Sequence, residues 1–413
     1  MQTAPESSAP ESSARESVAR ESSTHEFSAA DSDPACRPGH GPGALSRAEA
    51  ADAIELLLGK VARLRTLAGD RYPLYAHHGD WVLSRRGSWT PGFWVGLLRL
   101  TARITGDRTD RRRAEAAIAG LTERLGDDTV TRSMTFWYGA GTDRPDLTRE
   151  AARRLLATAD PGHGLVPIGT AWEPENGRRL VEVDCWGPLV RLLSRYAEEL
   201  GPESEGAARA WRTVVAQTRA CLRRCVRADS SDDQLPTIVE RFGISSSPEP
   251  SPPTAAARPA AWALLGLAES AAALSGTDPA LSGTGSTLAA DCVQSAVRLQ
   301  GRLLGQRAGP VEEGLIADTS AGTSAGTSAD TSADAIAAVA LHRLPSSVPH
   351  FAASARLRTA QLVREQLRAD GTFTGTRYRV ADGRLAEVES VWGYFFLLLA
   401  LAIDAELIRS DEF

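Results

Sequence analysis

Lysine is almost missing from this 413-residue chain: Lys60 is the only one, although lysine and arginine together number 46. The bias toward arginine, together with abundant alanine, is typical of GC-rich coding DNA, and we attach no chemistry to it. Aspartate and glutamate number 52, which leaves a net charge of -6. A chain with this balance lacks the basic surface that nucleic-acid binding requires. We therefore expect a small-molecule partner and no nucleic acid.

Cysteine pairs of the kind that bind metals are absent. The five cysteines are odd in number, and none forms a Cys-x-x-Cys motif. Metal centres and thioredoxin-like sites use such pairs, so we expect no metal, and no motif points to a cofactor. Unpaired thiols favour a reducing compartment, which predicts a cytoplasmic protein.

Long hydrophobic runs are absent as well. The longest, residues 391–403, has 13 residues, whereas a helix that crosses a bilayer needs about 20. Residues 1–30 contain no apolar run behind a basic start, which a secretory signal would need. We expect no membrane partner, and a buried helix at residues 391–403.

The first 43 residues differ in composition from the rest of the chain. They repeat Glu-Ser-Ser and Ala-Arg-Glu-Ser units and contain almost no large apolar residues. Such a segment cannot bury enough surface to offset the entropy lost on ordering. We therefore predict a disordered tail at residues 1–43 and a single folded domain at residues 44–413. A second low-complexity tract, residues 318–333, is predicted to be an expanded turn.

Helical periodicity begins at residue 44 and continues to the end of the chain. No run of regularly alternating residues indicates strands between the helices, so the sequence predicts an all-α protein. The eleven predicted helices are residues 51–67, 92–105, 113–125, 147–159, 185–200, 207–226, 258–275, 287–304, 333–343, 351–367 and 391–407.

Glycine-containing turns recur at the ends of these helices. Gly69 and Gly106 each precede an aspartate, and glycine at this place takes the left-handed C-cap conformation. Turns that recur between units of roughly 50 residues suggest a closed ring of helical hairpins. Loops rich in Trp, Gly and Pro, at residues 72–91, 166–178 and 240–257, lie between hairpins, and we expect a site to be built from such loops.

Several short motifs occur in an order and spacing that resemble one enzyme family. In chain order they are Trp89-Thr90-Pro91-Gly92-Phe93-Trp94, Trp172 with Pro174-Glu175-Asn176-Gly177, Val183-Asp184-Cys185, Arg258 with Ala261-Trp262, Asp330-Thr331-Ser332-Ala333 and Val391-Trp392-Gly393-Tyr394. Over residues 47–407 the chain resembles the unsaturated glucuronyl hydrolases, a family of glycoside hydrolases. The resemblance implies an (α/α)6 barrel, a toroid of helical hairpins.

The resemblance also implies a reaction and a catalyst. Enzymes of this family protonate the C4=C5 double bond of an unsaturated uronyl sugar, water adds at C5, and the resulting hemiketal collapses. The proposed acid and base is an aspartate that corresponds to Asp184. Apolar neighbours such as Val183 and Trp186 suit this role, because burial raises a carboxyl pKa. The alternative for Asp184 is a helix N-cap, where aspartate is favoured.

The chain departs from the family at the other catalytic positions. The family's His-Asp-x-Gly-Phe motif corresponds to residues 132–136, where Arg132 and Ser133 replace the functional histidine and aspartate. Arg132 either contacts an acidic group of the ligand, with Ser133 beside it, or is neutralised by Asp127 or Asp128. The family has another histidine at a position that corresponds to residues 232–237, and this chain has no histidine there. These losses predict a more apolar pocket and a changed substrate.

Tryptophans and one arginine remain as candidate substrate-binding residues. Trp89, Trp172 and Trp262 match family pocket positions and offer aromatic faces to a sugar ring. Arg258 opens a helix, where a basic side chain gains nothing from the helix dipole. It either makes a bidentate contact with a substrate carboxylate or forms a surface salt bridge. Trp94 and Trp392 are expected in the core.

Three functions are compatible with these observations, and the sequence does not fix the oligomeric state. The first is a glycosidase or hydratase in which Asp184 protonates a C=C bond or enol ether of a sugar-acid-like substrate. The second is a secondary-metabolite tailoring enzyme on the same scaffold that acts on a non-uronide alkene or enol ether. The third is a barrel that binds a ligand without catalysis.

Overall fold

Twelve α-helices are present in the described part of the chain. The computed structural model describes residues 43–413 except 228–236, 246–247, 253–255, 276–281, 306–329, 346–347, 349 and 382. The helices are α1 (Arg47–Ala68), α2 (Pro91–Thr105), α3 (Arg108–Gly120), α4 (Arg132–Gly139), α5 (Pro145–Thr158), α6 (Trp186–Leu200), α7 (Glu205–Arg224), α8 (Ala257–Ser275), α9 (Ser282–Gly305), α10 (Thr331–Arg343), α11 (His350–Gln366) and α12 (Val391–Asp404).

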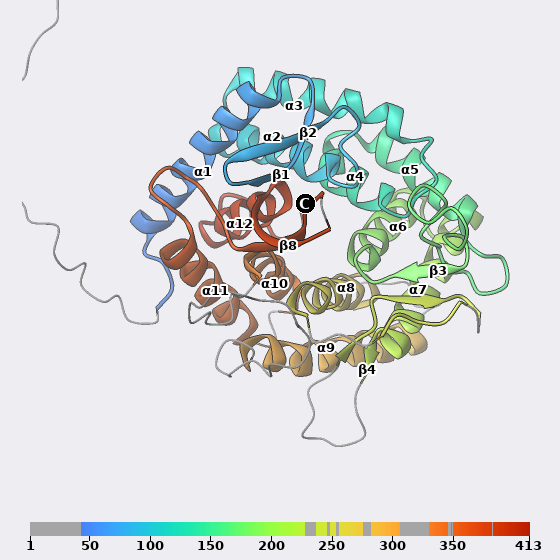
Figure 1. Ribbon diagram of the computed structural model, residues 1–413. Coiled ribbons are helices and arrows are strands. Elements are labelled where there is room, and N and C mark those ends of the chain that lie inside the picture. Colours follow the sequence, from blue (N-terminus) through green and yellow to red (C-terminus); the bar gives the residue numbers. More distant parts are fainter. Residues whose placement is uncertain are drawn as a thin grey trace, which may run out of the picture. The chain divides into compact units, whose positions relative to one another are not determined.

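The even-numbered helices form a closed inner ring. Each of them contacts the next, and α12 closes the ring on α2. The odd-numbered helices lie outside, and each packs beside an even-numbered neighbour in the chain (Figure 1). Six hairpins arranged in this way make an (α/α)6 barrel, which confirms the all-α fold predicted from the periodicity.

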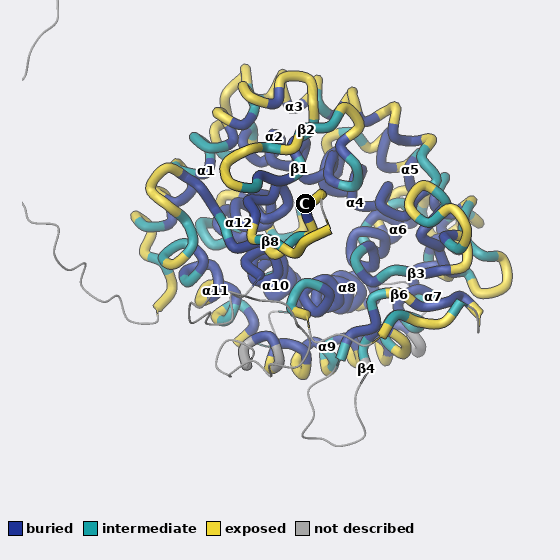
Figure 2. The backbone as a smooth tube through the Cα atoms, in the orientation of Figure 1, coloured by how far each residue is buried: buried dark blue, intermediate teal, exposed yellow. Residues whose placement is uncertain are grey.

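Burial distinguishes the two rings (Figure 2). In the inner helix α12 every residue from 391 to 402 is buried, whereas α3 of the outer ring buries Ala114 and Ile118. A helix that is apolar on all sides packs against neighbours all round, and an amphipathic helix leaves a polar face to solvent. Close approach between inner helices also needs glycine: a Cβ on Gly92 of α2 would lie 2.4 Å from the carbonyl oxygen of Met134 in α4.

The left-handed C-cap predicted at Gly106 and the buried C-terminal helix are confirmed, whereas the left-handed C-cap predicted at Gly69 is wrong. Gly106 has φ 64° and ψ 4°, the left-handed conformation, whereas Gly69 has φ 60° with ψ -119° and lies outside it. Trp94 and Trp392 are buried, as expected for core residues. No helix among the described residues is long and apolar enough to cross a membrane.

Helix α4 and all the strands were missed by the sequence analysis. The strands are β1 (Tyr72–His77), β2 (Asp80–Ser84), β3 (Leu180–Glu182), β4 (Val226–Arg227), β5 (Thr237–Ile238), β6 (Arg241–Gly243), β7 (Thr376–Arg379) and β8 (Leu385–Ser390). Four of them form a sheet in the order β2-β1-β8-β7, and β3 pairs with β6 and β4 with β5. The strands occupy loops that join the hairpins, so they add walls to one end of the barrel without changing its architecture.

Some sequence predictions fall outside the described residues. The chain divides into Met1–Gly41 and Pro42–Phe413, and the predicted disordered tail and most of the low-complexity tract at 318–333 lie where the structure gives no description. Both stay predictions. Of the cysteines, Cys185, Cys221, Cys225 and Cys292 are described, and they are buried and unpaired.

Candidate active site

A cavity of about 300 Å³ opens where inner helices begin. Trp89 precedes α2, Asp184 precedes α6, and Arg258 lies in the first turn of α8. The lining residues are Trp89, Thr131, Met134, Trp172, Glu182, Asp184, Cys185, Arg241, Arg258 and Tyr378. Four residues that were predicted from widely separated motifs therefore meet at one place: Trp89, Trp172, Asp184 and Arg258.

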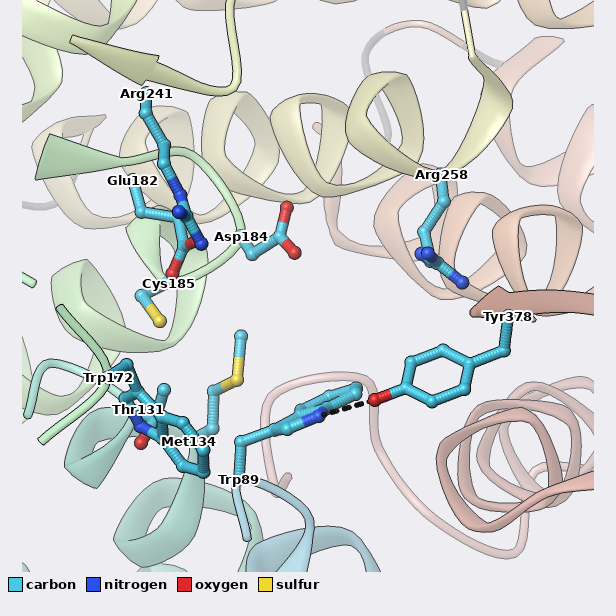
Figure 3. A pocket seen from close by; sticks show the side chains of 10 residues that line it. All are labelled: Trp89, Thr131, Met134, Trp172, Glu182, Asp184, Cys185, Arg241, Arg258 and Tyr378. Carbon is cyan, nitrogen blue, oxygen red and sulfur yellow. Dashed lines mark hydrogen bonds and ion pairs between the residues drawn. The ribbon is translucent and has the colours of Figure 1, made fainter. Parts of the chain in front are cut away.

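The cavity has an apolar side and a charged side (Figure 3). Trp89, Met134 and Trp172 lie together on one side, while the carboxylates and guanidinium groups of the lining residues face them from the other. Asp184 points into the space between these two sides. The arrangement suits a ring that stacks on an aromatic face and presents polar or reactive atoms to Asp184.

Asp184 is placed by the segment that joins β3 to α6. The amide of Val183 donates to the carbonyl oxygen of Glu240 (2.9 Å), and the Val183 side chain is fully buried. This anchor turns the following residue toward the cavity. The N-cap of α6 is Cys185, with no capping side chain, so the alternative prediction of a capping role for Asp184 is wrong. Among the described residues, none forms a side-chain hydrogen bond with the Asp184 carboxyl group.

The surroundings of Asp184 favour its protonated form. Burial raises the pKa of this carboxyl group well above its ordinary value, and the nearby charge of Glu182 raises it further. The positive charges of Arg258 and Arg241 act in the opposite direction but do not outweigh burial. A carboxyl group with a raised pKa can hold a proton near neutral pH and donate it.

Trp89 is fixed by an unusual backbone conformation and by aromatic neighbours. Gly87 has φ 75°, and a Cβ there would lie 2.6 Å from Pro91. Its neighbour Ser88 has φ 56°, and the Ser88 carbonyl oxygen accepts a hydrogen bond from Arg124 Nη2 (2.8 Å). The indole ring lies 4.8 Å from Trp392, centroid to centroid. The segment therefore positions one rigid aromatic wall.

Two further aromatic residues complete the mouth of the cavity. Trp89 Nε1 lies 3.5 Å from the hydroxyl oxygen of Tyr378 on β7. Trp172 is 45% exposed, so its ring is available to a ligand at the rim. Tyr378 was not predicted, because the strand that carries it was missed.

Arg258 is held by the protein but keeps donors for a ligand. Its Nη1 donates to the carbonyl oxygen of Arg377 (2.6 Å) and lies 3.5 Å from Asp330 Oδ2. The guanidinium carbon lies 5.7 Å from the centre of the Tyr378 ring. The polar contacts with described residues engage Nη1, so Nε and Nη2 can serve a ligand. Asp330 is itself buried, so the pair differs from the exposed salt bridge considered as the alternative.

Three predicted site residues lie away from the cavity. Trp262 is 1% exposed and packs in the barrel core, with its ring 5.5 Å from that of Phe396. Arg132 is buried, and its Nη1 donates to the carbonyl oxygen of Leu125 (2.8 Å). Ser133 is fully buried and donates to the carbonyl oxygen of Val130 (2.7 Å). None of the three reaches a ligand in this cavity.

The charge of Arg132 is balanced from within the protein. Burial lowers the pKa of its guanidinium, and Asp128 opposes that effect. This agrees with the second of the two alternatives, in which a neighbouring aspartate neutralises Arg132. Helix α4 instead presents Met134, together with Thr131 at its N-cap, to the cavity.

Glu182 and Arg241 line the cavity and were not predicted. They are paired residues of the antiparallel strands β3 and β6. The position of Glu182, two residues before Asp184, is a signal that was available in the sequence. It has meaning only if the segment is extended, because alternate residues of a strand share a side.

No family model matches the chain. In sequence, it is 31% identical over 193 residues to the unsaturated glucuronyl hydrolase of Bacillus sp. (strain GL1), a match to 43% of this chain and 49% of the relative. The sequence match thus spans about half the length of that curated relative.

Solved structures share the fold over most of their length. The unsaturated glucuronyl hydrolase of Bacillus sp. GL1 superimposes with a TM-score of 0.67 at 23% identity, over 86% of this chain and 96% of the other. The enzyme from Streptococcus agalactiae gives 0.66 at 18% identity, over 87% and 92%. One specific for heparin gives 0.65 at 15%, over 88% and 98%. The chain is therefore similar in sequence to an unsaturated glucuronyl hydrolase over about half of that enzyme's length, and it shares the fold of these enzymes over most of its own length.

Proposed function

We propose that this protein is an enzyme of the glycoside hydrolase type that hydrates a C=C bond or enol ether in a sugar-acid-like ring. Asp184 serves as the general acid and base. The observation that carries the proposal is the setting of Asp184, whose side chain points into the cavity, faces an aromatic wall, and has a raised pKa.

The proposed reaction uses both protonation states of Asp184. The neutral carboxyl group gives its proton to one alkene carbon, and the positive charge that develops on the other carbon is shared with the ring oxygen. Water attacks this second carbon, and the Asp184 carboxylate takes a proton from the water. In an unsaturated uronide the product is a hemiketal, which opens and releases the glycosidic partner. General acid–base catalysis of this kind contributes about 10²- to 10⁴-fold to the rate.

The remaining lining residues orient the ring. Trp89 supports one face of the ring by stacking, and Trp172 covers the part that extends to the rim. Arg258 offers Nε and Nη2, which form a fork suited to a carboxylate. The relatives suggest where to begin, because one is described as responsible for the degradation of glycosaminoglycan and another as specific for heparin. Unsaturated uronyl disaccharides are therefore the first substrates to test.

The decisive experiment follows the loss of the conjugated double bond by ultraviolet absorbance. Asp184→Asn should lower the rate on unsaturated uronyl disaccharides by at least about 100-fold. Asp52→Asn is the matched control, because Asp52 is an exposed residue of α1 and should leave the rate unchanged. Equal rates for wild type and Asp184→Asn would exclude Asp184 as the catalyst.

A tailoring enzyme for a less polar alkene is the second candidate. It is favoured by helix α4, which turns Arg132 and Ser133 away from the cavity and presents Met134. Absence of activity on uronides, together with a hydrophobic molecule found by mass spectrometry in the purified protein, would support it. The same burial of Arg132 and Ser133 fits a non-catalytic barrel, for which ligand binding must be indifferent to Asp184→Asn.

A further inference from the structure

The wall formed by α4 brings no ionisable group to the cavity. Thr131 and Met134 line it from this side, and Ser133, at the position where the family motif has aspartate, is fully buried. If Asp184 alone handled the proton, no second carboxylate would act on it. The structure shows, however, that another carboxylate lines the same cavity from a different element.

That carboxylate is Glu182, the last residue of β3. Val181 and Val183 are fully buried in the core, while Glu182 and Asp184 line the cavity. β3 ends at Glu182, and Val183 and Asp184 lie in the bend that leads from β3 into α6. Two carboxyl groups from one short segment therefore share one wall, separated by a single anchored valine.

Arg241 fixes the orientation of Glu182. Its Nε and Nη2 donate to Glu182 Oε1 at 3.0 and 2.8 Å. The two residues are register partners across β3 and β6. The backbone of Arg241 is tied in turn, since its amide donates to Ser251 Oγ (3.0 Å). Both strands thus hold the ion pair in place at the edge of the cavity (Figure 3).

We propose that Glu182 is the second carboxylate of this site and a positioning residue that acts through Asp184. Together with its partner Arg241, Glu182 sets the pH range in which Asp184 carries a proton. The inference rests on the proposed function, in which Asp184 is the acid and base. It assigns to the β3–β6 ribbon a role that the family motif locates on α4.

The physical basis is the repulsion between like charges in a poorly solvated place. A negative Glu182 disfavours ionisation of Asp184, and Glu240, just before β6, adds to this effect. Arg258 from α8 and Arg241 from β6 oppose it. The Cys185 thiol on the cavity wall stays neutral, because burial raises its pKa. The Cys225 thiol at the end of α7 is kept neutral in the same way.

The pKa of Asp184 should therefore shift in a predictable direction when either member of the Glu182–Arg241 pair is replaced. Removing the charge of Glu182 lowers the pKa of Asp184, so the protonated acid is lost at a lower pH. Removing the charge of Arg241 leaves Glu182 uncompensated and raises the pKa of Asp184. A purely structural role for the pair would give no such opposite effects.

The test is a titration of Asp184 by carbon-13 NMR in protein labelled at aspartate side-chain carboxyl groups, with Asp184→Asn to assign the signal. We expect Glu182→Gln to move the midpoint to lower pH and Arg241→Gln to move it to higher pH. Glu175→Gln is the matched control, because Glu175 is an exposed acid on the nearby loop and does not line the cavity. A midpoint that Glu182→Gln leaves in place overturns the proposal.

The same variants are then compared by the pH dependence of turnover. The rate should fall as pH rises through the pKa of Asp184, and this fall should begin at lower pH in Glu182→Gln. If no uronide is turned over, the proposed function fails while the NMR titration still decides the role of Glu182. Circular dichroism identifies any variant that has not folded, and the isosteric Glu182→Gln retains the shape of the side chain.

Discussion

Lys60, the chain's only lysine, forms an ion pair with the buried residue Glu389, with 2.7 Å between Nζ and Oε2. The hydroxyl group of Tyr394 donates to the same oxygen (2.6 Å) and accepts from the amide of Phe373 (2.9 Å). This network joins α1 of the outer ring to β8 and to α12 of the inner ring. It lies where the four-stranded sheet meets the barrel, and it fixes β8 just before the residue that caps α12.

Replacing Lys60 should destabilise the barrel. Lys60→Met leaves the carboxylate of Glu389 buried without its cation, and breaking a buried pair in this way costs about 3 kcal/mol. The free energy of unfolding measured in urea should fall by that amount. Arg409→Met is the control, because Arg409 is exposed where it pairs with Asp411 and such surface pairs contribute less than about 1 kcal/mol. Equal effects of the two substitutions would contradict the structural role of Lys60.

The raised pKa of Asp184 has a consequence for stability. Its pKa is higher in the folded state than in the unfolded chain, so the folded state binds more protons and stability falls as pH rises above the unfolded value of about 3.9. Asp184→Asn removes this penalty. The variant should therefore melt at a higher temperature than wild type at pH 7, and the difference should shrink as the pH approaches 4.

The control for this prediction is Asp52→Asn, which changes an exposed carboxylate of α1. Its melting temperature should follow that of wild type at both pH values. If Asp184→Asn gained no stability at neutral pH, the carboxyl group would not be held in an unfavourable environment, and the main support for its role as an acid would be removed.

Two tryptophans that were both predicted to bind substrate should behave in opposite ways. Trp172 is 45% exposed at the cavity rim, whereas Trp262 is 1% exposed in the core. Trp172→Ala should weaken ligand binding and leave the melting temperature unchanged. Trp262→Ala should cost about 3 to 5 kcal/mol of stability because it opens a cavity in the core. Calorimetric binding and thermal melts on both variants distinguish the two roles.

The ring of hairpins could be predicted from the sequence because its signals are long and regular. Eleven helices have apolar residues at helical spacing, and Gly69 and Gly106 mark two of their ends. Helix α4 was missed because its eight residues are all buried, so it has no polar face to create a periodic pattern. The strands are two to six residues long and were too short to be recognised between helices.

Part of the site could be predicted from the sequence. The residues that were not predicted lie on the strands that were missed. Asp184, Trp89, Trp172 and Arg258 adjoin predicted helices or loops, and they meet at the cavity. Glu182, Arg241 and Tyr378 lie on β3, β6 and β7, and pairing between distant strands cannot be read from local periodicity. Position in a motif also did not determine which side of α4 faces the cavity, so Ser133 was assigned to a site that it does not line.

Placing an aspartate at position 133, where the motif of the unsaturated glucuronyl hydrolases has one, should fail to add a second acid. Ser133 has no exposed surface and its hydroxyl group donates to Val130, whereas a carboxylate there cannot donate that bond and would be buried beside the neutral Cys185 thiol. Ser133→Asp should cost about 3 to 5 kcal/mol, the usual effect of an uncompensated buried charge. Thr131→Asp is the matched variant, because position 131 lines the cavity.

Comparing the two variants shows whether the effect of an added carboxylate depends on its place in the sequence motif or on its place in the cavity wall. Thr131→Asp should lower the free energy of unfolding in urea less than Ser133→Asp does, because residue 131 lines the cavity and water in the cavity can solvate its carboxylate. Its carboxylate would also add a negative charge near Asp184 and raise the midpoint of the Asp184 titration. If Ser133→Asp were as stable as wild type and raised that midpoint more than Thr131→Asp, then α4 would turn position 133 toward the cavity, and the role assigned to Glu182 would no longer be needed.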